Sequence, residues 1–570
     1  MCRERIRYFL GAKCAQAKKR KFMYSFDTHS WGMGESFFSA DFTSILFEND
    51  FKAVLPELFL VIASIILLIY GVIGSTSAEK GYPLLLGNCS WLTLYTLLIT
   101  LSLINSTPLV SGYLFYNSLV QDDFTFFLRS LLILGAIFTI CISLNYVQRE
   151  GLNSFELNIL ILLSTCSMMF LISSADFISM YLAIEMQSLC FYVMAALKRN
   201  SEFSSEAGLK YFLLGAFSSG LLLFGCSLIY GFTGCTEFGQ LGKIFECGTT
   251  GTAFSANATS VLPLLGEESA RDLTGYNFAG CELGMIFILV GFLFKCTAVP
   301  FHMWAPDVYE GAPTAVTAFF SIAPKIALFG VFVRVFLCSF YDFMFPWQKI
   351  LIFCSLASMI LGALAAMSQN KMKRLLAYSS IGHVGYLLVG LCCGTVEGIQ
   401  ALLIYLTVYI AMTINLFAII LLNLGRHDTS SAISLSPHVQ RVKYTTDLAQ
   451  LGSTNPLLAL SLGVTMFSIA GIPPLAGFYS KAALFFAAVS CSQYILALFG
   501  VITSVVSCFY YIRLVKIMYF EKSKMWCSFN QIPKSSSLSL AITFLFIVSF
   551  IVYPSPLYLA THKCALVLLF

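Results

Sequence analysis

Five ionisable residues lie inside apolar stretches of this chain, where a charge is costly: Glu185, Lys210, Lys295, Lys325 and Lys481. At the centre of a membrane-spanning helix each such charge costs about 2.5–3.5 kcal/mol on insertion scales. Burial disfavours the charged form of an ionisable group, whereas a nearby opposite charge favours it. One acid and several lysines can therefore exchange protons as their spacing changes. The alternative is that each forms a structural ion pair or reaches an interface.

Four further residues are weaker candidates for the same chemistry. Arg334 lies near the end of a predicted span, where its side chain can extend to the interface. His302 and His383 could relay protons because a histidine titrates near neutral pH, although a buried histidine satisfied by a backbone group is an equal alternative. Glu57 follows Pro56 at the start of the first predicted span and is equally well explained by the helix dipole.

Prolines interrupt two of the apolar stretches that contain these lysines. Pro300 follows Lys295, and the pair Pro473 and Pro474 precedes Lys481. A broken helix at membrane depth is tolerated only where it is buried in protein or lines a wet cavity. Paired breaks in the two halves of a chain indicate the ion site of a transporter. The spacing suggests two five-helix repeats, over about 156–337 and 348–518, without proving them.

The composition predicts an all-α membrane protein. Of 570 residues, 58% are hydrophobic and only 11% are charged, against about 25% charge in soluble domains, and the mean hydropathy is +0.82. A spanning helix needs about 20 apolar residues. Fourteen candidate spans follow: 53–74, 84–105, 125–145, 156–175, 177–197, 208–231, 283–303, 313–337, 348–367, 375–394, 397–424, 457–490, 493–518 and 538–560.

Basic residues alternate between the predicted loops, as expected if one side faces a negative interior. The loops assigned to the inner side contain Lys80, Arg149, Lys198, Arg199, Lys371, Lys373, Arg374, Arg441, Lys443, Lys522 and Lys524. The loops and tail assigned to the outer side contain only Lys243, Arg271, Lys349 and Lys563. The first span therefore runs from the outside to the inside.

Residues 1–51 do not fit the membrane pattern. The first 22 residues contain the bases Arg3, Arg5, Arg7, Lys13, Lys18, Lys19, Arg20 and Lys21 but only one acid, Glu4. No apolar core follows, so this is not a secretory signal. It is typical of a mitochondrial transit segment or of an inessential extension upstream of a later start such as Met23. Residues 232–282 and 425–456 are expected to be exposed loops that touch neighbours.

The chain lacks the sequence signals of several other classes. Its 19 cysteines include no Cys-x-x-Cys pair, and a lone buried cysteine behaves as a small hydrophobe. We therefore expect no iron–sulfur or zinc site. There is no Gly-x-Gly-x-x-Gly motif and no phosphate loop, so no nucleotide site is expected. A net charge of +5 does not suggest nucleic acid.

Five motifs around these residues resemble a known family. They are YLAIEMQSL at 181–189, EAGLKY at 206–211, PFHMWAPDVYEG at 300–311, KRLLAYSSIGHVGY at 373–386 and GIPPLAGF at 471–478. Together they resemble the subunit 2 family of mitochondrial NADH:ubiquinone oxidoreductase (respiratory complex I), in its plant-type long form, one of the antiporter-like membrane subunits. The resemblance covers about residues 50–570. The first 50 residues and a longer 425–456 loop depart from it.

The resemblance implies fourteen helices, two inverted five-helix repeats and two discontinuous helices. It implies that Glu185 and Lys295 form the pair that first receives protons, that Lys210 modulates this pair, and that Lys325 and Lys481 relay protons onward. It implies no metal and no cofactor on this chain. NADH, FMN, iron–sulfur clusters and ubiquinone would be handled by partner subunits, and other complex I membrane-arm subunits would lie on both sides within the inner mitochondrial membrane.

The implied organisation is an N-terminal extension (1–51), N-terminal helices (52–150), two repeats (151–338 and 339–520) and a C-terminal transmembrane helix (521–570). Three alternatives stay open on the sequence. A chloroplast counterpart would serve photosynthetic electron flow. A cation/proton antiporter would work without an NADH-oxidising partner. A scaffold subunit would support assembly alone, so that Lys295→Ala would leave proton pumping unchanged.

Overall fold

The computed structural model describes residues 50–75, 83–107, 112–150, 154–249, 267–422, 424–426, 442–521, 527–529 and 532–569. Lys52–Phe570 form one compact unit. The predicted basic segment at residues 1–22 and the central part of each predicted long loop (250–266 and 427–441) lie outside the described residues.

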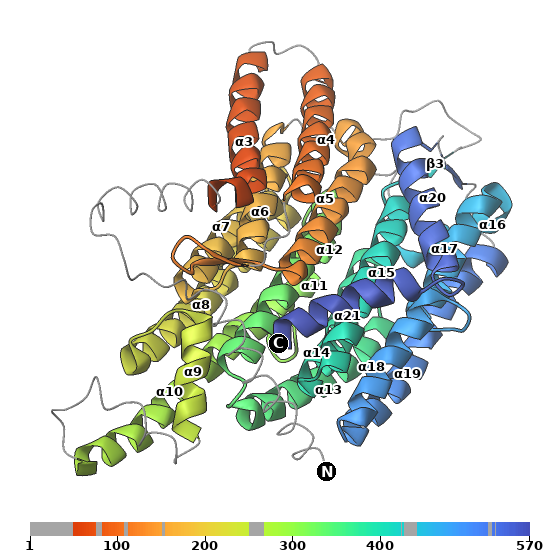
Figure 1. The fold of residues 1–570 in the computed structure, drawn as a ribbon. Coiled ribbons are helices and arrows are strands. Elements are labelled where there is room, and N and C mark those ends of the chain that lie inside the picture. The colour runs from red at the N-terminus through yellow and green to blue at the C-terminus, as the bar shows by residue number, and fades with distance from the viewer. Residues whose placement is uncertain are drawn as a thin grey trace. The chain divides into compact units, whose positions relative to one another are not determined.

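The described part of the chain is built almost entirely from helices (Figure 1). The helices before the first break are α3 Leu55–Gly74, α4 Pro83–Ser106, α5 Asp123–Arg149, α6 Glu156–Ser173, α7 Phe177–Ala195, α8 Glu202–Thr233, α9 Phe238–Thr249 and α10 Glu267–Cys296. From the break onward they are α11 Trp304–Gly311, α12 Thr314–Arg334 with the π-helical turn η2 Val335–Ser339, α13 Met344–Met367, α14 Met372–Cys393 and α15 Val396–Ile420. The last are η4 Thr445–Leu448, α16 Leu451–Thr454, α17 Pro456–Ala470, α18 Ala476–Ser490, α19 Tyr494–Phe520, α20 Lys534–Ser549 and α21 Ser555–Leu569.

Among the described residues, two short antiparallel strand pairs accompany these helices. Strand β1 Gly112–Leu114 forms a hairpin with β2 Leu119–Gln121, and β3 Leu424–Arg426 pairs with β4 Cys527–Phe529. The second pair brings the segment after α15 beside the segment before α20.

The predicted multi-pass membrane architecture is confirmed. Twelve described helices are long and apolar enough to cross a membrane, and α17, α18 and α20 are shorter apolar helices. Counting the interrupted pair α17–α18 as one crossing and α20 as another accounts for all fourteen predicted segments.

The 457–490 segment is broken where the sequence predicts, because Gly471, Pro473 and Pro474 separate α17 from α18. Other predicted boundaries were wrong. The 538–560 segment is also not one span: α20 ends at Ser549, and α21 begins after Pro554. The loop predicted at 232–282 contains α9 and the first turns of α10. The span predicted at 208–231 begins earlier, at Glu202.

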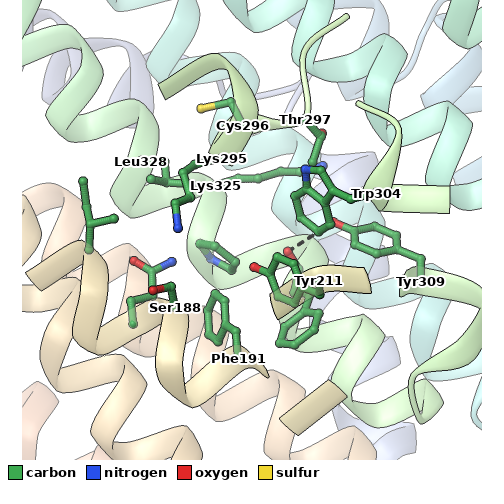
Figure 2. A pocket seen from close by; sticks show the side chains of 14 residues that line it. Ser188, Phe191, Tyr211, Lys295, Cys296, Thr297, Trp304, Tyr309, Lys325 and Leu328 are labelled. Atoms are coloured by element: carbon green, nitrogen blue, oxygen red, sulfur yellow. Dashed lines mark hydrogen bonds between the residues drawn. The ribbon is translucent and has the colours of Figure 1, made fainter. Parts of the chain in front are cut away.

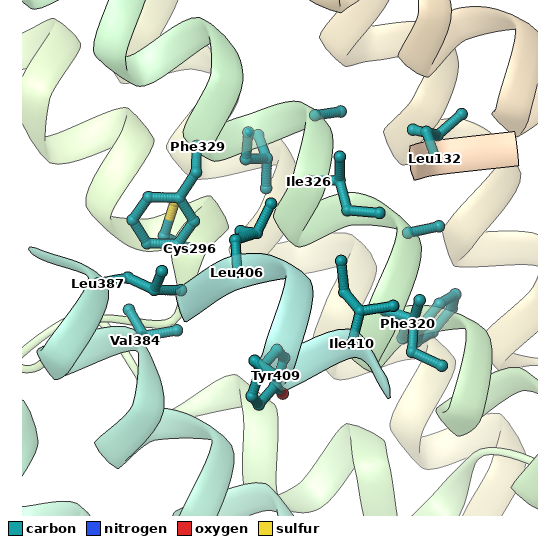
Figure 3. Packing of buried hydrophobic residues seen from close by; sticks show 14 of the residues in the cluster. Leu132, Cys296, Phe320, Ile326, Phe329, Val384, Leu387, Leu406, Tyr409 and Ile410 are labelled. Carbon is teal, nitrogen blue, oxygen red and sulfur yellow. The ribbon is translucent and has the colours of Figure 1, made fainter. Parts of the chain in front are cut away.

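Three helices form the interior of the bundle. Every residue of α12 is buried, and almost every residue of α14 and α15 is buried. Figure 3 shows the close packing of apolar side chains between these helices, including Ile326, Val384 and Ile410. The peripheral helices α3, α4, α8 and α19 expose many large apolar side chains, which is the surface expected to face lipid.

Contacts between loops agree with the predicted alternation of sides. On the side assigned to the interior, Lys198 pairs with Glu150 at 3.4 Å, and Lys371 forms a β-bridge with Tyr444. On the opposite side, Lys563 of α21 pairs with Asp123 at 3.2 Å. Helix α21 runs across the bundle from α15 to α5 (Figure 1).

Hydroxyl side chains within the helices donate hydrogen bonds to backbone carbonyl oxygens of the same helix. Serine and threonine residues repeatedly donate to the carbonyl oxygen one turn earlier, as Thr317 does to Thr314 at 2.8 Å. This arrangement removes the cost of placing a hydroxyl where water is excluded.

Candidate functional site

The first predicted helix break is present and lies beside Lys295. Helix α10 ends at Cys296, the next residue Thr297 has a φ of 66°, and α11 begins at Trp304. The carbonyls freed at the end of α10 are partly satisfied, since the Phe294 oxygen accepts from the Trp304 indole at 3.1 Å. Lys295 thus occupies the last turn of a helix, where the dipole favours a cation.

The Lys295 amine has no hydrogen-bond partner among the described residues, although its Nζ atom is buried. The centroid of the Tyr192 ring lies 6.0 Å from this Nζ atom. Lys295 and Lys325 line one cavity together with Ser188 and Tyr211 (Figure 2). The cavity has a volume of about 30 Å³ that water-sized molecules can occupy, which is room for water but for little else.

Glu185 lies one turn before Ser188 on α7. Its Oε1 atom is buried without a hydrogen-bond partner among the described residues, and its Oε2 atom accepts a long hydrogen bond from Ser188 Oγ at 3.4 Å. Glu185 and Lys295 do not form an ion pair within 4.0 Å in the described structure. Ser188 connects them, because it contacts the carboxylate and also lines the cavity of Lys295.

Lys325 lies in the buried helix α12, immediately after Pro324, and its side chain is held by a neutral partner. Its Nζ atom donates to Tyr409 Oη at 2.7 Å and lies 4.7 Å from the centroid of the same ring. Lys325 is only 4% exposed. A hydroxyl and an aromatic face stabilise an ammonium group less than a carboxylate does.

The second break positions Lys481. Helix α17 ends at Ala470 and is followed by Gly471, which has a φ of 89°; α18 begins at Ala476. The Lys481 amine reaches back to α17 and donates to the carbonyl oxygens of Ile469 at 2.9 Å and Ala470 at 3.0 Å. The negative end of a helix binds cations in this way.

Three adjoining cavities connect the buried lysines. Tyr309 lines the cavity of Lys295 and Lys325 and also a second cavity lined by His383 and Tyr409. His383 in turn lines a third cavity that contains Lys481. Hydroxyls line all three, so water could be hydrogen-bonded along this row.

The two candidate histidines differ in position. His383 is 5% exposed, and its Nδ1 atom lies 2.5 Å from Tyr405 Oη. His302 is half-buried in the first helix break, and its Nδ1 atom has no hydrogen-bond partner among the described residues. His302 is not among the residues that line the three cavities.

Lys210 differs from the other four candidates because it is not buried. Its side chain is 40% exposed and pairs with Glu206 at 2.6 Å and Asp307 at 3.0 Å. Asp307 also binds Arg374 at 2.7 Å. Lys210 lies, as predicted, within a helix that is long and apolar enough to span a membrane, but its side chain belongs to an ion cluster with Glu206 and Asp307.

Two ion pairs involve charged residues that the sequence analysis either treated as weaker candidates or did not identify. Glu57 is fully buried and pairs with Arg129 at 2.9 Å. Arg334 does not extend to the interface but pairs with Asp122 at 3.3 Å. Arg129 was missed, although a single arginine within the apolar run of α5 could have identified it.

Among the described residues there is no group of three or more His, Cys, Asp or Glu side chains that could hold a metal ion.

Comparisons with known proteins agree with this geometry. Residues 174–507 match the family model described as NADH:quinone oxidoreductase/Mrp antiporter, TM. The chain is 57% identical to NADH-ubiquinone oxidoreductase chain 2 of Marchantia polymorpha, over 92% of this chain and 100% of that one. It is 53% identical to the protein of the same name in Arabidopsis thaliana, over 92% and 99%. A chain of respiratory complex I from Thermus thermophilus has a similar fold, with a TM-score of 0.68, 27% identity and coverage of 88% and 98%. The family match spans both helix breaks and all the buried lysines, so the chain belongs to the NADH:quinone oxidoreductase/Mrp antiporter transmembrane family.

Proposed function

We propose that this chain transfers protons across the inner mitochondrial membrane as an antiporter-like subunit of NADH:ubiquinone oxidoreductase. One observation supports this most strongly. Lys325 and Lys481 are buried, and the half-buried Lys295 has a buried amine. These three lysines have no carboxylate within 4.0 Å among the described residues and line adjoining cavities. Buried charges that serve only stability are normally paired.

The neutral surroundings of these lysines suit proton transfer. An ammonium group held by a hydroxyl or by carbonyl oxygens can lose its proton without leaving a carboxylate unpaired. Glu185 and Lys295 would take up the proton, Lys325 would receive it at the centre, and Lys481 would release it. Because the lysines change protonation one after another, the total charge in the bundle changes by no more than one unit at each step.

Lys210 and His302 have secondary roles in this proposal. Lys210 would modulate the first pair through its cluster with Asp307, and His302 would exchange protons near Lys295. The two proposed repeats, 151–338 and 339–520, would each contribute one broken helix.

The redox chemistry would belong to partner subunits. NADH, FMN, iron–sulfur clusters and ubiquinone would be bound by those subunits, and other membrane-arm subunits would flank this chain. The names of the plant relatives, and the respiratory complex from which the Thermus chain comes, support this assignment.

Membership of the complex can be tested on organelle membranes without any variant. We expect peptides of this chain in a megadalton band of a native gel that also oxidises NADH, together with peptides of mitochondrial partner subunits. Mass spectrometry of the excised band makes the measurement. Peptides confined to a separate band without NADH oxidation would instead favour an independent cation/proton antiporter.

A substitution at the second break should weaken the exit lysine. A methyl group at Gly471 would lie 3.1 Å from Lys481 Cδ and 3.3 Å from its Nζ, and a side chain in the left-handed region costs about 1–2 kcal/mol. Gly471→Ala should therefore reduce NADH-driven proton uptake by vesicles of the assembled complex. Gly463→Ala is the matched control, because its added methyl would meet only Tyr519, at 3.9 Å. Equal uptake in the two variants would show that Gly471 does not position Lys481.

A further inference from the structure

The connection between Lys325 and Lys481 passes two buried tyrosines that the proposed relay has not used. Tyr405 and Tyr409 lie one turn apart on the same face of α15 and are 1% and 2% exposed. Tyr409 Oη accepts from Lys325 Nζ at 2.7 Å, and Tyr405 Oη lies 2.5 Å from His383 Nδ1. The two hydroxyls thus contact the two ionisable groups that flank the second cavity.

We propose that Tyr409 is a proton-relay residue between Lys325 and His383, and that Tyr405 is the positioning residue that orients the His383 imidazole. This inference rests on the proposed function, because it assigns the step between two members of that relay.

The hydroxyl of Tyr409 has the geometry that a neutral relay needs. A tyrosine oxygen can accept one hydrogen bond while its own hydrogen is donated elsewhere. Because Lys325 occupies an acceptor position, the hydroxyl hydrogen is free to point into the second cavity, which Tyr409 shares with Ser380 and His383. The His383 and Tyr409 ring centroids are 5.1 Å apart.

The proposed transfer balances without forming a tyrosinate. As the Lys325 ammonium gives its proton to Tyr409 Oη, the original hydroxyl proton of Tyr409 leaves, directly or through water, for the His383 imidazole. Lys325 becomes a neutral amine, His383 becomes an imidazolium, and Tyr409 is a neutral phenol before and after. The proton then leaves the imidazole towards the third cavity and Lys481.

Tyr405 would decide which imidazole nitrogen takes part. The hydrogen bond made by one ring nitrogen of a histidine sets the role of the other. Since Tyr405 occupies Nδ1, Nε2 is left as the nitrogen that exchanges protons. A further aromatic ring, that of Tyr386, lies beside Lys481, with its centroid 5.1 Å from Lys481 Nζ.

The test replaces only the hydroxyl. In Tyr409→Phe the ring that faces the Lys325 ammonium remains, so packing and the cation–π contact are kept. We expect NADH-driven proton uptake by the assembled complex to fall on the order of a hundredfold, the low end for a positioned proton-transfer group. We also expect its solvent deuterium isotope effect to rise, because an impaired proton step becomes rate-limiting. Tyr146→Phe is the control, since it removes a buried hydroxyl that lies 3.3 Å from Thr314 Oγ1, away from the three cavities.

Normal uptake in Tyr409→Phe, or slow uptake with an unchanged isotope effect, would overturn the proposal. If Tyr409→Phe does not assemble, Tyr405→Phe decides with the same two readouts, and normal values there count against the proposal. Lys325→Ala separates this test from that of the function. Impaired uptake in Lys325→Ala with normal uptake in Tyr409→Phe would remove only the tyrosine relay, whereas normal uptake in both would remove the proposed function as well.

Discussion

Replacing Lys325 with alanine should nearly abolish proton transfer through this chain while the complex still assembles. Lys325 is the central group: it shares one cavity with Lys295 and, through Tyr409, borders the next. Its loss removes a positioned proton-transfer group, which is worth on the order of a hundredfold or more in rate. The rate of NADH-driven proton uptake, normalised to the amount of assembled complex on a native gel, makes the measurement.

The controls for Lys325→Ala separate chemistry from packing. Deletion of the lysine side chain leaves a cavity, so Lys325→Met, which fills a similar volume, should show the same defect. Lys349→Ala removes an exposed lysine at the start of α13 and should leave uptake unchanged. If Lys325→Met transferred protons normally, the defect of the alanine variant would be a packing effect.

Arg129→Ala is expected to produce the largest loss of stability. Arg129 and Glu57 form a pair at 2.9 Å between α5 and α3, and they are only 4% and 0% exposed. Removing one partner of a buried pair costs about 3–5 kcal/mol, because the remaining charge is left uncompensated. The amount of the chain in the assembled complex, and the temperature at which the complex dissociates, should both fall.

The double variant provides the decisive comparison for this ion pair. Replacing both charges with apolar residues, as in Glu57→Leu with Arg129→Leu, removes the unpaired charge and is often neutral or stabilising. We therefore expect the double variant to assemble better than Arg129→Ala. A double variant as unstable as the single one would mean that the pair is needed for more than charge balance.

Composition predicted the membrane helices because every helix that crosses the bilayer needs about 20 mostly apolar residues. The breaks beside Lys295 and Lys481 were also predictable, since Pro300, Pro473 and Pro474 cannot continue a helix. A predicted span was wrong where one apolar run contained a turn between two helices. The predicted span 538–560 contains Pro554, and there the structure forms two helices, α20 and α21.

The partners of the charged residues could not be predicted, because they lie far away in the sequence. Tyr409 is 84 residues from Lys325, and Asp122 is 212 residues from Arg334. No local pattern indicates such contacts. The ion partner of Lys210 on α11, Asp307, likewise lies 97 residues away.

The number of protons taken up per NADH oxidised, measured on the assembled complex in closed vesicles, tests the central claim most directly. We predict a lower ratio or stalled turnover in Lys295→Ala, Lys325→Ala and Lys481→Ala, with the wild-type ratio kept in Lys349→Ala. An assembled Lys325→Ala complex that turned over at the wild-type rate with the wild-type ratio would contradict the account, because protons would then cross without the buried lysines of this chain.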